Sequence, residues 1–368
     1  MNVDNGSCLS TLLLIAAVLG FGAGVLFLGV QTPVAPPQAD LAALPTPAPT
    51  LVPPPSELRI GLVTHEGGEI DDQSFNQAVW LGVQAAAASL GAETAYIETQ
   101  DSTDYATNIA EFAENGYDII VTVGVAMGEA TRAAAAAYPD IHFIGADQAQ
   151  PEPLPNLTGL VFHEDRAGYL AGVLAGRLTR SGVVGGIYGT ALAPSIVAFA
   201  TGFENGVHAA NPDTQVITTY HPGGFGVAFS DPEWGAATAA QAIDQGADVI
   251  FAAGGSTGFG ALVETAARTT TDAPLYCIGV DVDQWITVPE ARPCLVSSAV
   301  KQIAEGVEQI VMQVIAGQPP AGNFFGGVGL ADFHDFAAVI PADVQAELQD
   351  IAAGLASGEI DTGYTPGG

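Results

Sequence analysis

The sequence predicts an α/β protein with two doubly wound, parallel-sheet lobes that are joined by a hinge and hold a ligand in the cleft between them. Three observations lead to this fold. From Arg59 onward, short apolar runs alternate with Ala-rich stretches of helical period; this alternation occurs in two successive series; and an amphipathic helix follows the second series. The 368 residues suffice for two domains, and the 48% of apolar residues suffices for their cores.

The first series of elements has the βαβ pattern of a parallel sheet. An apolar run predicts a strand at 59–64, and Ser74-x-x-Gln77 has the capping-box pattern of a helix that begins at Ser74. Apolar residues from Val79 to Leu90 then recur at helical spacing. Further strands are expected at 95–98, 119–124, 142–146 and 159–162.

The second series repeats this pattern after a helix at 165–180. Its strands are expected at 183–189, 215–221, 248–255 and 275–281. A helix at 300–317 comes last, and we expect it to cross back and complete the first lobe. The resulting domains are 58–163 plus 300–318 for lobe 1, and 164–299 plus 319–368 for lobe 2.

The N-terminal region differs in composition from the rest of the chain. Residues 11–30 contain no charge and match the length of a membrane-spanning helix, so we expect residues 1–30 to hold a membrane anchor or a signal segment. No Lys or Arg precedes this run, which favours an uncleaved anchor. Residues 31–57 include nine prolines and predict an extended stalk. We therefore expect a folded module held outside the cytoplasm at the cell membrane.

Charge and motif content exclude several functions. The formal net charge of −32 argues against nucleic acid as a partner, and the seven arginines are too scattered to form a phosphate site. The chain contains no HExxH or CxxC motif, and its six histidines are scattered, so we expect no catalysis, no metal and no cofactor. Cys277 lies in an expected strand, either as a buried apolar residue or bridged to Cys294.

Two carboxylates follow expected strands at the cleft. Asp147 ends the run HFIGAD and Asp281 ends CIGVD. Carboxylates at this edge accept paired hydrogen bonds from vicinal hydroxyls, which suits a sugar or the ribose of a nucleoside. Helix capping is the alternative role for each of them.

Other candidates surround the same edge. Phe75, at the first helical position, projects toward the cleft, where it either stacks on a planar ring or serves as a hydrophobic staple. The loop from Glu66 to Asp72 is either a set of ligand acceptors or a solvated acidic turn. Lys301 is the only lysine of the chain, and we place it at the start of the late helix, donating to a ligand or pairing with Asp281.

Two glycine-rich segments complete the set. The loop GGSTGFG at 254–260 follows a strand and offers backbone N–H groups, but it lacks the GK[ST] ending of a nucleotide-binding P-loop. Phe225 and Phe229 lie in a Gly-rich segment before a helix and offer a second aromatic wall, or pack within the loop.

Taken in order, these segments resemble one family. RIGLVTHEGGEIDDQSFNQAVWLGV, YDIIVTVGVAMGEA, YPDIHFIGADQ, RAGYLAGVLAG, GADVIFAAGGSTGFG, CIGVDVDQW and VSSAVKQIAEGV are similar to the BMP family, the PnrA-like nucleoside-binding components of ABC importers. The similarity covers about residues 58–330. It implies a type I periplasmic-binding-protein-like fold, a purine nucleoside as ligand and an ABC permease as partner.

The resemblance also implies roles for individual residues. Phe75 and Phe229 sandwich the base, and the ribose is held by Asp147, Asp281, Lys301 and the Gly255 backbone. The family usually has an Asp after its first strand that reads the base edge, whereas this chain has Thr64-His65-Glu66 and an additional Glu69. The candidates for that role, together with their neighbour in the motif, are His65, Glu66, Asp72 and Asn76.

We therefore expect a monomeric, membrane-tethered solute-binding protein that closes on a neutral purine nucleoside. The closest alternative is the same fold binding a nucleobase, riboflavin or a sugar. From a different class, an anchored sensor would use the same module and stalk. A nucleoside hydrolase ranks third, because Asp71-Asp72 has no matching carboxylates at other strand ends.

Overall fold

The computed structural model describes residues 58–366. The expected anchor in 1–30 and the expected stalk at 31–57 lie outside the described residues. Within 58–366, no helix combines the length and the apolar character that a membrane span requires.

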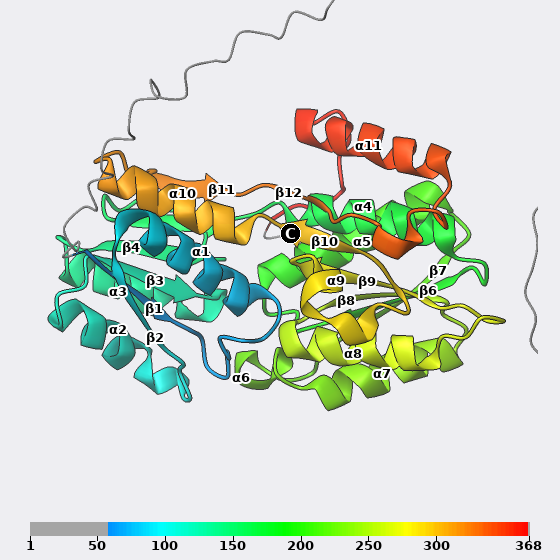
Figure 1. Ribbon diagram of the computed structural model, residues 1–368, viewed down its shortest axis with the longest axis horizontal. Helices are drawn as coiled ribbons and strands as arrows, with labels where there is room; N and C mark the ends of the chain where they lie inside the picture. Colours follow the sequence, from blue (N-terminus) through cyan, green and yellow to red (C-terminus); the bar gives the residue numbers. More distant parts are fainter. Residues whose placement is uncertain (1–57, 367–368) are drawn as a thin grey trace, which may run out of the picture. The chain divides into compact units, whose positions relative to one another are not determined.

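Two six-stranded sheets form the centres of two lobes, as the sequence predicts (Figure 1). The first sheet has the order β11-β5-β4-β3-β1-β2, and all its strands are parallel. Its interior strands are buried because helices cover both faces, whereas the edge strand β2 is partly exposed. The strands are β1 Arg59–Val63, β2 Glu93–Ile97, β3 Ile119–Val123, β4 His142–Ala146, β5 Leu157–Val161 and β11 Gly322–Phe325.

The second sheet repeats this arrangement in the order β12-β10-β9-β8-β6-β7. Only its short edge strand β12 runs antiparallel. The strands are β6 Val183–Tyr188, β7 Gln215–Tyr220, β8 Val249–Ala253, β9 Tyr276–Asp281, β10 Leu295–Lys301 and β12 Val328–Leu330. A disulfide joins Cys277 in β9 to Cys294, the residue before β10. Of the two roles that the sequence leaves open for Cys277, a free buried residue or a bridge to Cys294, the structure shows the bridge.

Helices cover both sheets. The first lobe carries α1 Phe75–Leu90, α2 Tyr105–Glu114, α3 Gly128–Ala137 and α10 Ile303–Ile315. The second lobe carries α4 Glu164–Leu178, α5 Pro194–Ala210, α6 Phe225–Ala228, α7 Pro232–Asp244, α8 Gly255–Arg268, α9 Gln284–Thr287 and α11 Ala342–Ser357. Single 3₁₀ turns occur at Ser102–Asp104, Val125–Met127, Pro289–Ala291 and His334–Phe336.

Three short connections cross between the lobes and form the hinge. They are residues 162–163, residue 302 and residues 326–327. The second of them carries α10 back to the first lobe, where it packs on α1, as expected for the late helix (Figure 1).

Two details of the expected domain division are wrong. Residues 295–301 form strand β10, so Lys301 ends a strand of the second sheet and the helix begins only at Ile303. The backbone of 299–301 pairs with β12 and holds this segment extended. The segment 319–368 is divided between the lobes, because β11 adds to the first sheet beside β5.

Helices α4 and α5 pack so closely that their contact requires glycine. A Cβ atom on Gly172 would overlap the carbonyl oxygen of Phe203, and one on Gly168 would overlap that of Phe199. Gly206 of α5 faces α4 in the same way. Both helices thereby press against the second sheet, whose strand ends position one wall of the cleft.

Candidate functional site

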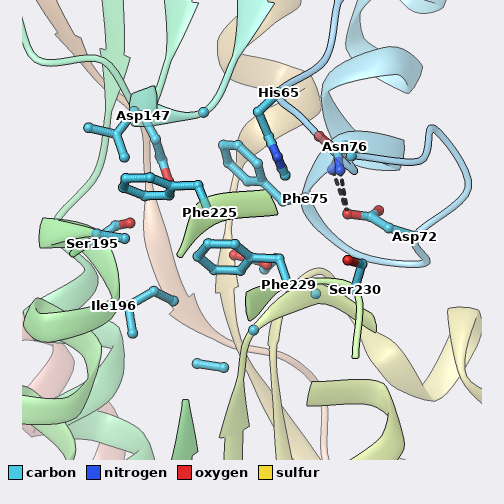
Figure 2. A pocket seen from close by; sticks show the side chains of 18 of the residues that line it. His65, Asp72, Phe75, Asn76, Asp147, Ser195, Ile196, Phe225, Phe229 and Ser230 are labelled. Atoms are coloured by element: carbon cyan, nitrogen blue, oxygen red, sulfur yellow. Dashed lines mark hydrogen bonds between the residues drawn. The ribbon is translucent and has the colours of Figure 1, made fainter. Parts of the chain in front are cut away.

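A cavity lies between the lobes at the carboxyl ends of both parallel sheets (Figure 2). The empty space between its lining atoms, with the open mouth included, is about 830 Å³. The side chains from the first lobe that define it are His65, Asp72, Phe75, Asn76 and Asp147. Those from the second lobe are Ser195, Ile196, Phe199, Phe225, Phe229, Ser230, Asp281 and Lys301.

Lys301 lies at the centre of a buried charge cluster. Its side chain is 2% exposed, and its Nζ lies 3.2 Å from Asp147 Oδ2, 3.4 Å from Asp281 Oδ1 and 3.5 Å from Glu164 Oε1. Because Asp147 belongs to the first sheet and Lys301 to the second, this ion pair crosses the cleft. Pairing with Asp281 is one of the two roles that the sequence leaves open for Lys301, and the structure shows this pair; the sequence wrongly places Lys301 in the same lobe as Asp147.

Three carboxylates around one ammonium cannot all be ionised without leaving buried negative charge in excess. Burial raises the pKa of Glu164 to about 8, although Lys301 opposes this shift. Burial likewise raises the pKa of Asp147. Burial also disfavours the charged form of Lys301, but the three carboxylates outweigh that effect and raise the pKa of Lys301 above its usual range. Glu164 therefore keeps its proton at neutral pH.

Asp147 and Asp281 occupy equivalent positions in the two lobes, each at the carboxyl end of a strand. Each stands at a strand end with a left-handed backbone, φ +57° for Asp147 and +66° for Asp281. This conformation is uncommon outside glycine and turns both carboxylates into the same cavity. Asp281 also accepts a 2.7 Å hydrogen bond from the Ser74 hydroxyl of the first lobe, so a second polar contact spans the cleft.

Four phenylalanines contribute to the apolar part of the cavity, namely Phe75, Phe199, Phe225 and Phe229, and Figure 2 labels all of them except Phe199. Phe75 is the first residue of α1, as predicted, and its ring centroid lies 4.3 Å from Lys301 Nζ. Phe225 begins the single-turn helix α6 and Phe229 follows its end, so both reach the cavity. The sequence leaves the choice between Phe225 and Phe229 open, and the structure brings both to the site.

The start of α1 is capped differently from the predicted capping box. The Ser74 side chain makes no capping hydrogen bond, because it donates to Asp281 instead. Asp72 takes its place and accepts from the backbone N–H groups of Ser74, Asn76 and Gln77 at 3.0–3.1 Å. Burial raises the pKa of Asp72 to about 6, although these N–H groups oppose the shift. Asp72 thus fixes Asn76 at the cavity wall.

The residues of the loop after β1 differ in whether they line the cavity. His65 lines the cavity and contacts Phe229 edge to face, with 6.0 Å between ring centroids. Glu66 does not line the cavity: its carboxylate lies against Gly226 of the opposite lobe. Gly255, with φ +54°, begins α8 and lines the cavity with Gly254 and Ser256.

Nine of the ten residues that the sequence predicts for the site line this one cavity, and Glu66 is the exception. The sequence does not single out Glu164, Ser195 or Ser230. Glu164 is the first residue of α4 and becomes notable only through its contact with Lys301. A signal for Ser230 was its place in the Gly-rich segment that also carries Phe229.

The chemistry of the arrangement is recognition rather than reaction. Aromatic faces, acceptor carboxylates and one ammonium converge on a small enclosed volume. Among residues 58–366, no group of three His, Cys, Asp or Glu side chains is placed to hold a metal ion.

Solved solute-binding proteins of ABC transporters share this fold of two α/β lobes. A solved solute-binding protein of an ABC transporter system from Aeropyrum pernix K1 superposes with a TM-score of 0.71 at 24% identity, over 84% of this chain and 93% of that one. A second solved solute-binding protein of an ABC transporter system, from Conexibacter woesei, superposes with a TM-score of 0.65 over 84% of this chain and 99% of that one.

Residues 59–329 match the model of the Bmp family, described as ABC transporter substrate-binding protein PnrA-like, and the chain belongs to this family. A CD4+ T-cell-stimulating antigen of Listeria monocytogenes is 29% identical over 84% of this chain and 89% of that protein. The ABC transporter nucleoside-binding protein BmpA of Lactococcus lactis is 29% identical over 62% of this chain and 65% of that protein. Members of this family are solute-binding proteins rather than enzymes, and they act outside the cytoplasm.

Proposed function

We propose that this protein binds a neutral purine nucleoside between its lobes and delivers it to an ABC permease. The observation that carries the proposal is the convergence of Phe75, Phe225 and Phe229 with Asp147 and Asp281 in one cavity. Aromatic faces suit the base, and carboxylates that accept paired hydrogen bonds suit the ribose hydroxyls. The printed name of the Lactococcus lactis relative, a nucleoside-binding protein, supports the same ligand class.

The charges at the site favour a ligand without a phosphate. Lys301 is the only lysine among the lining residues, and three carboxylates already surround it. A phosphate would enter beside Asp147 and Asp281 and be repelled by them. Hydroxyl groups instead donate to these carboxylates, while Lys301 donates to a hydroxyl oxygen.

Binding is expected to be coupled to closure of the lobes. The ligand would contact Asp147 and Phe75 in the first lobe and Asp281 and Phe229 in the second, so only the closed form offers all its contacts. Such a ligand shifts the population toward the closed form by these differential contacts. We further propose a monomer that is tethered to the cell membrane by its N-terminal segment.

Isothermal titration calorimetry of the purified protein with guanosine, inosine, adenosine, free bases, riboflavin and sugars tests the proposal. We expect binding of purine nucleosides, an affinity loss of at least about tenfold in Asp281→Ala, and a loss of about 5- to 100-fold in Phe75→Ala from the removed stacking. Tyr96→Ala removes an exposed aromatic outside the cavity and should leave affinity unchanged. Binding of sugars or riboflavin in place of nucleosides would refute the proposed ligand.

A further inference from the structure

A second cavity lies between the lobes and adjoins the ligand cavity described above. The empty space between its lining atoms, with the open mouth included, is about 1990 Å³. Val125, Asp147 and Ser195 line both cavities, so the two meet at these residues. The first lobe contributes the start of α3 and the residues after β4, and the second lobe contributes the starts of α4 and α5. The second cavity is therefore formed by both lobes, like the first.

The C-terminal segment 358–366 forms one wall of the second cavity. Thr362 and Tyr364 of this segment line it. Thr362 is only 5% exposed, because its hydroxyl donates to Asp165 Oδ2 of α4 at 2.6 Å and its carbonyl oxygen accepts from Asn205 Nδ2 of α5 at 2.6 Å. These two hydrogen bonds fix the segment on the second lobe, so the second cavity is a walled compartment of the fold.

Hydrogen bonds between the lobes close the ligand cavity on the side of α1 and α9. The Ser74 hydroxyl, directly before α1, donates to Asp281 at 2.7 Å. The Thr287 hydroxyl of α9 donates to the carbonyl oxygen of Gln73 at 2.9 Å. The boundary with the second cavity lies instead beside α5, which carries Ser195. A group that extends beyond the ligand cavity therefore finds space in the second cavity.

The sugar end of a bound nucleoside borders this second cavity. Of the residues that we propose to contact the ligand, Asp147 alone lines both cavities, and its proposed partner is the ribose. Phe75 and Phe229, proposed to stack on the base, line only the ligand cavity. Because the vicinal hydroxyls of the ribose are the donors to the carboxylates, the 5′ carbon is the position left to carry a substituent.

The lining of the second cavity indicates the chemistry of such a substituent. Phe325 is 57% exposed and stacks on His163 with 5.0 Å between ring centroids, which offers an apolar surface to an alkyl chain. Carboxyl groups outnumber guanidinium groups, so a further negative charge is repelled. The carboxyl groups are those of Glu129, Asp147, Glu164, Asp165 and Asp361, and the guanidinium groups are those of Arg132 and Arg166.

We infer that this protein binds nucleosides that carry an uncharged or cationic substituent on the 5′ carbon, and that the second cavity holds this substituent. The inference rests on the proposed function and names a wider class of solute for the same site.

Calorimetry on the full-length protein tests this inference with two sets of probes, the 5′-deoxy-5′-(2-aminoethylthio) and 5′-deoxy-5′-(carboxymethylthio) derivatives of guanosine, inosine and adenosine. The corresponding 5′-deoxynucleosides are the reference, because they lack the same hydroxyl and carry no substituent. The aminoethylthio derivative should bind within about tenfold of its reference or more tightly. The carboxymethylthio derivative should bind at least about tenfold more weakly than the aminoethylthio derivative.

A variant that fills the second cavity locates the substituent. Gly128 lines the second cavity only, its backbone is helical, with φ −54° and ψ −42°, and a Cβ atom there meets no packing neighbour within 4 Å. Gly128→Trp should therefore weaken the aminoethylthio derivative at least about tenfold and leave the 5′-deoxynucleoside unchanged. Gly329→Trp is the matched control, because Gly329 has equally open space, lines neither cavity and should change neither affinity.

The outcomes separate this inference from the proposed function. If the aminoethylthio derivatives bind more than about tenfold more weakly than their references, the inference is wrong while the nucleoside function stands. The inference is also wrong if Gly128→Trp weakens both ligands equally or neither of them, and equal affinity for the two derivatives overturns the assigned charge. If no nucleoside binds, the proposed function itself fails. Should Gly128→Trp not fold, the comparison in the wild type decides.

Discussion

Replacing Glu164 by Gln should make the protein more stable, and increasingly so as the pH rises. Glu164 has a pKa of about 8 in the folded protein against an ordinary value of 4.5, because it is buried. A group whose pKa is raised by folding contributes stability that is fully present below about pH 4.5 and is lost as the pH rises through about 8. Gln stays neutral and can still accept from Lys301.

The size of the effect follows from the one proton that Glu164 releases when the wild-type protein unfolds between about pH 4.5 and pH 8. Each pH unit within this window removes about 1.4 kcal/mol from the wild type, so Glu164→Gln should gain roughly 3 kcal/mol relative to the wild type between pH 5 and pH 7. Asp72 titrates in both proteins and cancels from the difference, which then reports Glu164 together with its neighbour Asp147.

Urea unfolding of both proteins at pH 5, 6, 7 and 8 measures this difference. Glu111→Gln, at an exposed position of α2, controls for the loss of one carboxylate and should show no growing gap. A gap between Glu164→Gln and the wild type that stays constant from pH 5 to pH 8 would show that Glu164 does not hold the buried proton.

Three further variants test the fold and the charge cluster. Lys301→Met leaves the buried carboxylates of Asp147 and Asp281 without their cation and should lower the free energy of unfolding by about 3–5 kcal/mol at pH 7 and by less at pH 5, as chemical denaturation will report. Gly172→Val forces a side chain against the Phe203 carbonyl and should cost roughly 3 kcal/mol, whereas an unchanged thermal midpoint would contradict the close α4–α5 contact. Replacing Cys277 and Cys294 by Ala opens a bridge between residues 17 apart and should cost about 3 kcal/mol, measured against the oxidised wild type.

Local sequence patterns predict the parts of the site that depend on strand ends. Asp147 and Asp281 follow apolar runs, and parallel strands bring such positions to one edge. Phe75 likewise opens a helix whose apolar period is plain in the sequence. The two-lobed fold and these three cavity residues follow from this periodicity, whereas His65 and Asn76 enter through the family resemblance.

The sequence predictions fail where the structure depends on contacts between residues that are far apart in the chain. Ser74 fits a local capping box, yet its hydroxyl bonds to Asp281, 207 residues further along the chain. The helical period after Ile303 extends back over Lys301 in the sequence, but pairing with Val328 keeps Lys301 in a strand. The raised pKa of Glu164 comes from burial in the folded chain, which no local pattern encodes.

The left-handed backbone at Asp147 and Asp281 is a strain that the buried charge cluster of Lys301 outweighs. Glycine adopts that conformation without steric cost, so Gly at either position would relax a strain of about 1 kcal/mol or more. The same change would delete a carboxylate from the cavity. Because both carboxylates also pair with the buried Lys301, losing either should cost more stability than the relieved strain returns, and mutational screens that reward thermal tolerance alone should still retain Asp at both positions.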